Sequence, residues 1–184
     1  IDDIPIHVRS TFSEKSGTKI VSEIDIDHKK AVTGIAFSKN NSKVSIIGVV
    51  DKPGVAADIF EPIGENNINI DMVIQNTSLD GKTANITFTI KQEDLKKTLN
   101  IIEENKQKIN YKKITQNDKL AVVSIIGAGM IASPGVTHKM FRSLANEKIN
   151  ILAISTSEIK ISVLIQEDMI KKAVKILHKT FELN

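Results

Sequence analysis

Two similar stretches of the chain join a strand-like run to the start of a helix and could each bind a small anion. The first, VSIIGVVDKPG, ends at Gly54, and the second, VSIIGAGMIASPG, ends at Gly135. In both, alternating and β-branched apolar residues precede a polar turn and a Pro-Gly pair that opens an apolar-periodic stretch. Unpaired N–H groups and the positive end of the dipole at such a helix start favour a carboxylate or a phosphate. The sequence therefore predicts capture of a small anionic ligand.

The Pro-Gly pairs also predict where the two helices begin. Pro53 and Pro134 suit the first helical position, because a proline there loses no hydrogen bond, and Ser133 is a typical N-cap. Gly54 and Gly135 would leave the backbone uncovered at the helix start.

A second set of polar residues follows each predicted helix. The stretches are NINIDMVIQN from Asn67 and KINILAISTSE from Lys148. We expect a βαββαβ unit to place the start of its second strand beside the turn before its first helix. The groups expected near Gly54 and Gly135 are then Asp71, Gln75, Thr156, Ser157 and Glu158. An amino acid needs N–H donors for its carboxylate and an acid for its ammonium group, and Asp71 and Glu158 are the candidate acids.

Neither motif is specific by itself. A Pro-Gly pair after a strand is most often only a turn, and Asn-Ile-Asn-Ile is most often only the start of a strand. Their joint recurrence favours a site, although a duplication also copies structural residues. The histidines lack metal-ligand spacing, and no catalytic triad, glycine-rich phosphate loop or pair of catalytic carboxylates is apparent. We therefore assign no metal ligand and no catalytic residue; the histidines are His7, His28, His138 and His178.

A constant spacing relates the two halves and indicates a duplication. An offset of 81 residues relates Pro53-Gly54 to Pro134-Gly135 and the Asn-Ile pair at Asn69 to that at Asn150. Later in the chain, Gln92-Glu93-Asp94 corresponds to Gln166-Glu167-Asp168 at an offset of 74. We infer that about seven residues are missing from the second hairpin.

The elements predicted for the first half follow the order βαββαβ, which is the order of a ferredoxin-like α+β fold. Pro62 lies late in the first predicted helix and costs it a hydrogen bond or a kink. The predicted elements are a strand over 44–50, a helix over 53–65, strands over 68–75 and 83–90 around an Asp80-Gly81 turn, a helix with Gln92-Glu93-Asp94 in its first turn, and a strand over 109–114.

The second half ends one strand short of this order. A strand at 31–37, followed by a polar turn at 38–42, has no partner in the first unit, and an incomplete sheet leaves an open edge. We therefore expect this strand to complete the second unit, so that the first unit is inserted into the second. The predicted divisions are 1–30 as a linker with a short strand at 6–9, 43–117 as the first unit, and 31–37 with 118–184 as the second.

Composition narrows the class of protein. The 184 residues carry a formal net charge of +3 and contain no cysteine, which excludes disulfides and thiolate metal sites. The lysines are scattered as on solvated helix faces rather than along a nucleic-acid track. No signal peptide or membrane-spanning apolar run is apparent. We expect a cytoplasmic protein with neither nucleic acid nor a membrane as partner.

Several stretches together resemble the C-terminal regulatory region of bacterial aspartate kinase (aspartokinase), a pair of ACT domains. They are VSIIGVVDKPGVAADIF, NINIDMVIQN, VSIIGAGM, SPGVTHKMF and INILAISTSEIKISVLI, and the resemblance covers residues 31–184. PIHVRSTFSEKSGTKI is similar to the segment that joins the kinase domain to this region. The Lys-Phe-Gly-Gly-Thr-type motif of the family's kinase domain is absent from this sequence.

The resemblance implies a function. Enzymes of this family phosphorylate aspartate with ATP on the route to lysine, threonine and methionine, and lysine, threonine or both bind the ACT pair as feedback inhibitors. ATP would serve the kinase domain or subunit, and the resemblance implies no cofactor for this chain. Two chains typically pair as a homodimer, with ACT domains side by side and effectors between them. The effector contacts implied are Asp51, Gly54, Val55, Ala56, Asp71, Gln75, Asn150, Ile151, Ser157 and Glu158.

Other functions remain possible from the residues. A tandem ACT module could serve a different amino-acid biosynthetic enzyme. RNA-recognition modules share the βαββαβ order but stack bases on aromatic side chains of their central strands, where this sequence offers only Phe88. A small phosphatase of this fold would need an arginine in the first loop, where this sequence has Asp51-Lys52.

Overall fold

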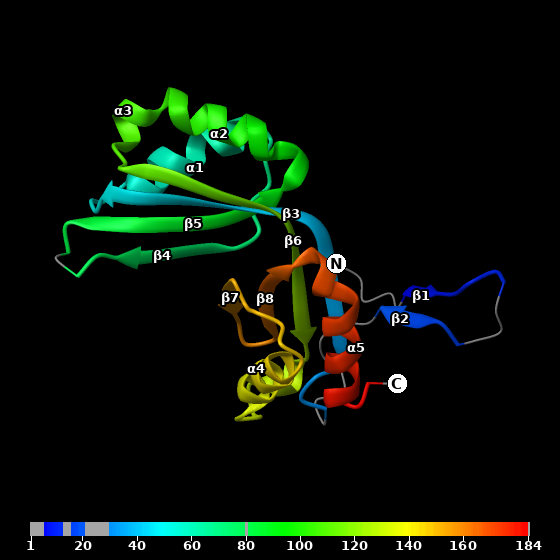
Figure 1. Cartoon of the computed structure of the whole chain (residues 1–184). Helices are drawn as coiled ribbons and strands as arrows, with labels where there is room; N and C mark the ends of the chain where they lie inside the picture. The colour runs from blue at the N-terminus through cyan, green and yellow to red at the C-terminus, as the bar shows by residue number, and fades with distance from the viewer. Residues whose placement is uncertain (1–5, 13–15, 21–29, 80, 184) are drawn as a thin grey trace.

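The computed structural model describes residues 6–12, 16–20, 30–79 and 81–183. Its largest feature is a six-stranded antiparallel sheet in the order β4-β5-β3-β6-β8-β7 (Figure 1). A separate two-stranded sheet pairs β1 (Ile6–Val8) with β2 (Thr18–Ile20). The strand predicted at 6–9 is therefore present, although the rest of the expected linker falls partly outside the described residues. Among the described helices, none is long and apolar enough to cross a membrane.

Two long strands run through both halves of the large sheet. They are β3 (Gly34–Val50) and β6 (Lys113–Ile126), and they pair antiparallel. The prediction of a polar turn at 38–42 is wrong, because these residues continue β3. The register shifts there, and Asn40 adopts a left-handed conformation with φ 55°. A bulge of this kind absorbs an irregular polar stretch without ending the strand.

Pairing divides each long strand between two units. Residues 34–38 of β3 pair with residues 122–126 of β6, and Gly34 lies opposite Ile126. Residues 43–47 of β3 pair with residues 113–117 of β6 and, on the other side, with β5 (Thr83–Lys91). The N-terminal part of β3 thus lies in the second unit. The exact domain limits 43–117 and 118–184 stay a prediction.

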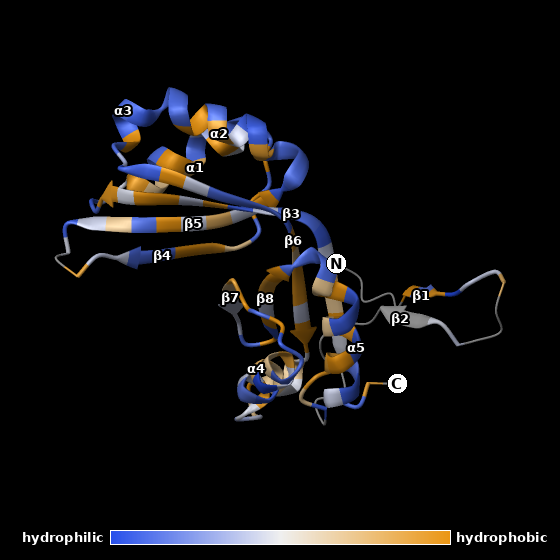
Figure 2. Cartoon of the chain, viewed as in Figure 1, coloured by the Kyte–Doolittle hydropathy of each residue, from blue (hydrophilic) through white to orange (hydrophobic). Residues whose placement is uncertain are grey.

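The first unit has its helices on one face of the sheet and follows the order βαββαβ that the sequence predicts. Its other elements are α1 (Val55–Glu65), β4 (Val73–Thr77), α2 (Leu95–Glu104) and the short α3 (Lys106–Ile109). Ile59 of α1, Ile102 of α2 and Phe88 of β5 are fully buried between the helices and the strands. Figure 2 shows apolar segments in α1 and α2 and in the strands that they cover.

The second unit repeats this arrangement. It contains α4 (Val136–Asn146), β7 (Ala153–Thr156), β8 (Lys160–Gln166) and α5 (Ile170–Thr180). Met140 and Leu177 of the helices pack on Val163 of β8, and Val32 is buried in the same core. The predicted fold, two ferredoxin-like units with the first inserted into the second, is confirmed.

The helix starts differ in detail from the prediction. The first helical residues are Val55 and Val136, and Gly54 and Gly135 are the N-caps, with φ 92° and 96°. The prolines therefore precede the caps instead of occupying the first helical position, and Ser133 does not cap α4. Each Pro-Gly pair forms a turn whose second residue is left-handed, a conformation that favours glycine over serine.

Two other predicted boundaries move. β4 begins at Val73 rather than at residue 68, because Ile68 packs in the helix-side core whereas Met72 packs on the opposite face. The segment between them therefore passes from one face of the sheet to the other. The strand predicted at 109–114 is the first part of β6, and Ile109 instead ends α3. Asp80 of the predicted hairpin turn lies outside the described residues, and Gly81 has φ 66°.

The offset of 74 for the acidic turns is also wrong. The turns are 3₁₀ helices over Gln92–Asp94 and Glu167–Met169, and they are related by 75 residues. Strand pairing agrees, since Lys91 lies opposite Asn41 and Gln166 lies opposite Leu120. The matching Gln-Glu-Asp letters are therefore shifted by one position between the two units.

Candidate functional site

Each unit presents an uncovered turn at the start of its first helix. A Cβ atom built on Gly54 or Gly135 would meet nothing within 4 Å, so the space beside both glycines is open. The first helical bond of α1 runs from the Asp58 amide to the Gly54 carbonyl at 2.9 Å. Among the described residues, the amides of Ala56 and Ala57 have no backbone acceptor. Such free donors at a helix N-terminus can receive an anion.

Asp51 and Val55 flank this turn in the first unit. Asp51 follows β3, is half-buried, and its amide donates to the Lys82 carbonyl at 3.0 Å. Val55 is buried in the core and its amide donates to the Lys52 carbonyl at 3.2 Å. Asp51 therefore offers a carboxylate at the turn, whereas the Val55 side chain is closed to a ligand.

The starts of the second strands lie elsewhere, at the centre of the molecule. The Asp71 amide donates to the Thr89 carbonyl at 3.1 Å, and the equivalent Leu152 amide donates to the Leu164 carbonyl at 2.8 Å. Between these two points is a small apolar cluster on the helix-free face. Its buried members are Met72, Leu120, Val122 and Leu164, with Leu152 and Ala153 against them.

The expectation that the strand start lies beside the helix start is therefore wrong. Thr89, which binds the Asp71 amide, lies opposite Lys43 of β3. Lys43 is eight residues before Asp51, about 26 Å away along an extended strand. The physical reason is that β3 and β4 both run antiparallel to β5 and so start at the same end, while α1 returns the chain from the other.

The remaining residues of the predicted site divide between the centre and the far ends. Asn150 and Ile151 precede β7 at the centre, and Ile151 packs partly against the second core. Gln75 is exposed in the middle of β4, opposite Ile86. Ser157 and Glu158 form the exposed turn after β7.

The turn after β7 lies beside the loop that leads to α4. The Gly127 amide donates to the Ile159 carbonyl at 2.9 Å, which ties the two segments together. The Ser157 amide donates to the Lys160 carbonyl at 2.8 Å and closes the turn. Ser157 and Glu158 are thus at the end of the second unit that carries the Gly135 turn, as the sequence predicts.

A small cavity beside Asp71 contains groups that the sequence did not single out. It has a volume of about 350 Å³, and its polar lining includes Asp71, Asn69, Asn41 and Lys91. The Lys91 ammonium group donates to the Ser38 hydroxyl at 2.8 Å. Asn41 and Lys91 are brought here by the pairing of β3 with β5, so no local motif could have indicated them.

The candidate site residues are therefore separated within one chain. The helix starts lie at the two far ends, and Asp71, Asn150 and Ile151 lie at the centre. In the described part of the chain, no group of three or more His, Asp or Glu side chains could hold a metal ion. The arrangement suits an organic ligand bound by backbone amides and carboxylates.

Comparison with known sequences finds the same two repeats in a known domain family. A model of the ACT domain matches residues 44–105 and 123–181. The aspartokinase of Mycolicibacterium smegmatis is 43% identical over 185 residues, which cover 98% of this chain and 44% of the relative. The chain therefore spans less than half the length of the curated relatives that it matches.

Solved structures share most of this arrangement. A chain in the crystal structure of aspartokinase alpha and beta subunits is 46% identical, with a TM-score of 0.76, and the match covers 83% of this chain and 99% of that one. The ligand-free regulatory subunit of aspartate kinase from Thermus thermophilus is 34% identical, with a TM-score of 0.75 and the same coverage.

Proposed function

Because this chain belongs to the ACT domain family, as the regulatory part of an aspartokinase, we propose that it binds lysine, threonine or both and mediates feedback inhibition of ATP-dependent aspartate phosphorylation. The observation that carries the proposal is the repeated helix start at Gly54 and Gly135, open to solvent and bearing free amides. Those amides suit the carboxylate of an amino acid.

Two chains are needed to close a site of this kind, and the sheet offers edges for them. β4 and β7 are the terminal strands of the six-stranded sheet, so each has one unpaired side. Val73 and Ile154 on these strands are 51% and 41% exposed. An exposed edge with apolar side chains favours addition of a further strand. We propose a homodimer in which β4 of one chain pairs with β7 of the other.

Antiparallel pairing of these edges would bring the separated groups together. The start of each strand would then lie beside the end of its neighbour. The partner subunit's Asn150 and the partner subunit's Ile151 would approach the turn that contains Asp51, Gly54 and Ala56. By the same geometry, Asp71 would approach the turn that holds the partner subunit's Glu158. The helix amides would bind the ligand carboxylate, and an acid would bind its ammonium group.

Inhibition follows from linkage. An effector inhibits the enzyme only if it binds the inactive arrangement more tightly than the active one, and such coupling is typically ~1–3 kcal/mol per effector. In this proposal the effector changes how the paired units are arranged relative to each other. The attached catalytic part responds to that change.

Calorimetric titration of the chain with lysine and threonine, singly and together, tests the proposal. We expect saturable binding of at least one of them, and Asp71→Ala should weaken it at least tenfold. Glu104→Ala is the matched control, because it removes an equally exposed acid from the outer surface of α2. Absence of binding to both amino acids, with binding of a third, would instead support a sensor for a different biosynthetic enzyme.

A further inference from the structure

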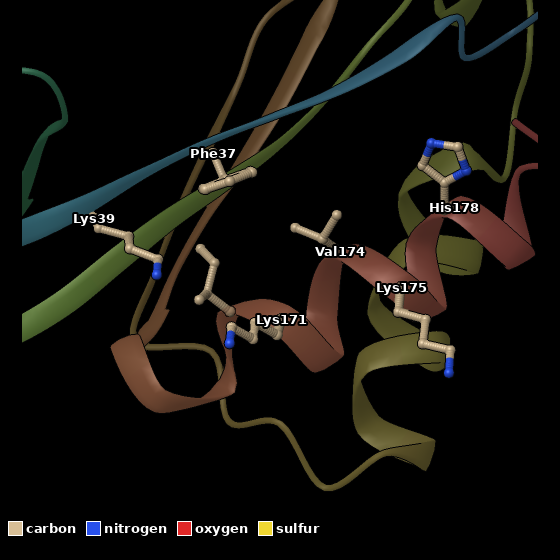
Figure 3. A pocket seen from close by; sticks show the side chains of 7 residues that line it. Phe37, Lys39, Lys171, Val174, Lys175 and His178 are labelled. Carbon is tan, nitrogen blue, oxygen red and sulfur yellow. The ribbon is translucent and has the colours of Figure 1, made fainter. Parts of the chain in front are cut away.

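A basic, apolar-floored groove lies on the second unit, between β3 and α5. We call it the α5 groove, and its volume is about 510 Å³. Figure 3 shows Phe37 of β3 and Val174 of α5 on its two sides, with the Lys39 and Lys171 ammonium groups at one end. Phe37 is 55% exposed and so offers apolar surface to a ligand or partner. The α5 groove is lined by Phe37, Lys39, Ile170, Lys171, Val174, Lys175 and His178.

The first unit provides an internal comparison. Phe37 pairs with Val123, and Gln116 pairs with the equivalent Val44, so Gln116 stands where Phe37 stands in the second unit. The same offset of 79 residues relates Lys39 to Asp118. The offset of 75 between the acidic turns makes Glu103 the counterpart of His178. The two units therefore differ at these three positions, which are polar or acidic in the first unit and apolar or basic in the second. The helix positions Leu95, Lys96 and Leu99 of the first unit match Ile170, Lys171 and Val174 in character.

A free strand edge adjoins the groove. Within the described residues, positions 34–38 of β3 pair with β6 on one side only, because the pairing of β3 with β5 begins at Asn41. Unpaired backbone groups of an edge strand can accept an extended segment from another chain or domain. The lining carries three lysines and no acid, so charge complementarity favours an acidic segment with apolar side chains.

The side of the molecule that carries α5 and the β1–β2 hairpin is available for contact with the rest of the enzyme. More than half of the length of the curated relatives has no counterpart in this chain. The β1–β2 hairpin lies on the α5 side in Figure 1, opposite the β4 and β7 edges, and exposes Ile6 and Val8. A two-stranded hairpin alone is at best marginally stable, so contact with further chain on this side would stabilise it.

We propose that the α5 groove docks an extended acidic segment of the catalytic part of the aspartokinase, whose apolar side chains cover Phe37 and Val174. This inference rests on the proposed role as a regulatory region. The contact would join the second unit to the catalytic part, while the β4 and β7 edges remain available for pairing between regulatory units.

Amide hydrogen exchange tests the docking, by comparison of the isolated chain with the whole enzyme. We expect residues 34–38 and α5 to exchange at least tenfold more slowly in the whole enzyme. The double variant Lys171→Glu with Lys175→Glu should abolish this extra protection, and high salt should weaken it. The control Lys96→Glu with Lys97→Glu makes the same charge change on α2 of the first unit and should leave the protection unchanged.

Three outcomes would overturn the inference. The first is equal exchange in the isolated chain and the whole enzyme, and the second is protection that survives the double variant. The third is protection of the isolated chain that rises with its concentration. This third outcome would mean that a second copy of the chain occupies the groove. Inhibition by lysine or threonine is measured on the same samples. Intact inhibition with an unprotected groove refutes the docking alone, whereas a protected groove without inhibition refutes the proposed function alone.

Discussion

Single residues determine how much space is available to a ligand at the start of α1. Ala56 lies in the first turn of the helix, half-buried, and follows the open space left by Gly54. Its amide is one of the free donors there. A larger side chain at this position would occupy the space in which the ligand carboxylate should lie.

We therefore expect Ala56→Thr to weaken effector binding at least tenfold while changing the free energy of unfolding by less than about 1 kcal/mol. Ala57→Thr is the matched control, because Ala57 is exposed in the same turn. Calorimetry and urea denaturation of both variants measure the two quantities. Equal affinities in the two variants would contradict the assignment of Ala56.

Another residue links stability to pH far from the candidate site. Tyr111 is buried and donates a hydrogen bond of 2.5 Å to the Glu103 carboxylate. Burial, together with this hydrogen bond and the charge of Glu103, raises the pKa of Tyr111 to about 12. The unfolded value is about 10, so folding favours the protonated phenol. The resulting stability is complete below pH about 10 and is lost as the pH rises to about 12.

Tyr111→Phe should lower the free energy of unfolding by about 1 kcal/mol at neutral pH, because a hydrogen bond to a charged acceptor is lost. The variant should also lose less stability than the parent between pH about 10 and about 12. Tyr111 is the chain's one tyrosine, and there is no tryptophan, so ultraviolet absorbance follows its titration directly. A phenol that titrates near 10 in the folded chain would refute this account.

At the scale of elements, each Pro-Gly pair sets a helix start by backbone conformation rather than by a side-chain cap. α1 and α4 both have a left-handed glycine as N-cap and no side-chain capping bond. Inside α1, Gly64 has helical geometry and open space around it. The two glycines of this helix region should therefore respond in opposite ways to the same substitution.

Gly54→Ala should destabilise the chain by about 1–2 kcal/mol, because an L-residue is strained at φ 92°. Gly64→Ala should stabilise it by about 0.5–1 kcal/mol, since alanine has the higher helix propensity and meets no neighbour. Urea denaturation of both variants measures the difference. Effects of the same sign would show that the left-handed conformation of Gly54 does not determine how position 54 responds to a side chain.

At the scale of the whole molecule, two long strands make the units depend on each other. Val32 lies in the core of the second unit, and Ile35 packs against it. The backbone of Ala31 and Val32 passes so close to Gly127 that a Cβ there would lie 2.2 Å from the Ala31 carbonyl oxygen. The chain just before the first unit thus helps to hold the second together.

Deletion of residues 31–37 should unfold the second unit selectively. In hydrogen exchange we expect β8 to lose its protection while β5 retains it. Gly127→Ala is a milder variant that should weaken the same unit through the steric clash with Ala31. Equal protection of β8 before and after the deletion would refute the predicted completion of the second domain by this strand.

The terminal edges of the sheet lead to a prediction about assembly. If β4 pairs with a second chain, Val73→Lys should weaken dimerisation at least tenfold, because it places an unpaired charge at the interface. Leu79→Lys is the control, since Leu79 is more exposed but lies in the turn after β4. Sedimentation equilibrium measures both variants. Equal dissociation constants would exclude the β4 edge as the interface.

Local patterns of residues were enough to predict the repeat, the βαββαβ order and the glycine turns. These features depend on local alternation, helical periodicity and the need of a turn for a left-handed residue, all of which act between near neighbours. Asp51, Gly54 and Ala56, which the family resemblance implied as effector contacts, lie close together because they are near neighbours in the sequence at the start of α1.

How the two units share strands, and which candidate residues lie together, depends on strand pairing across the whole fold. The polar residues at 38–42 are locally typical of a turn, yet pairing with β6 and a bulge at Asn40 keep them in one strand. The sequence predicts that Asp71 and Gly54 are neighbours, yet the antiparallel pairing of β5 with β3 and β4 places them at opposite ends of the first unit. Register and strand order depend on contacts between residues far apart in the chain, which no local pattern of residue types specifies.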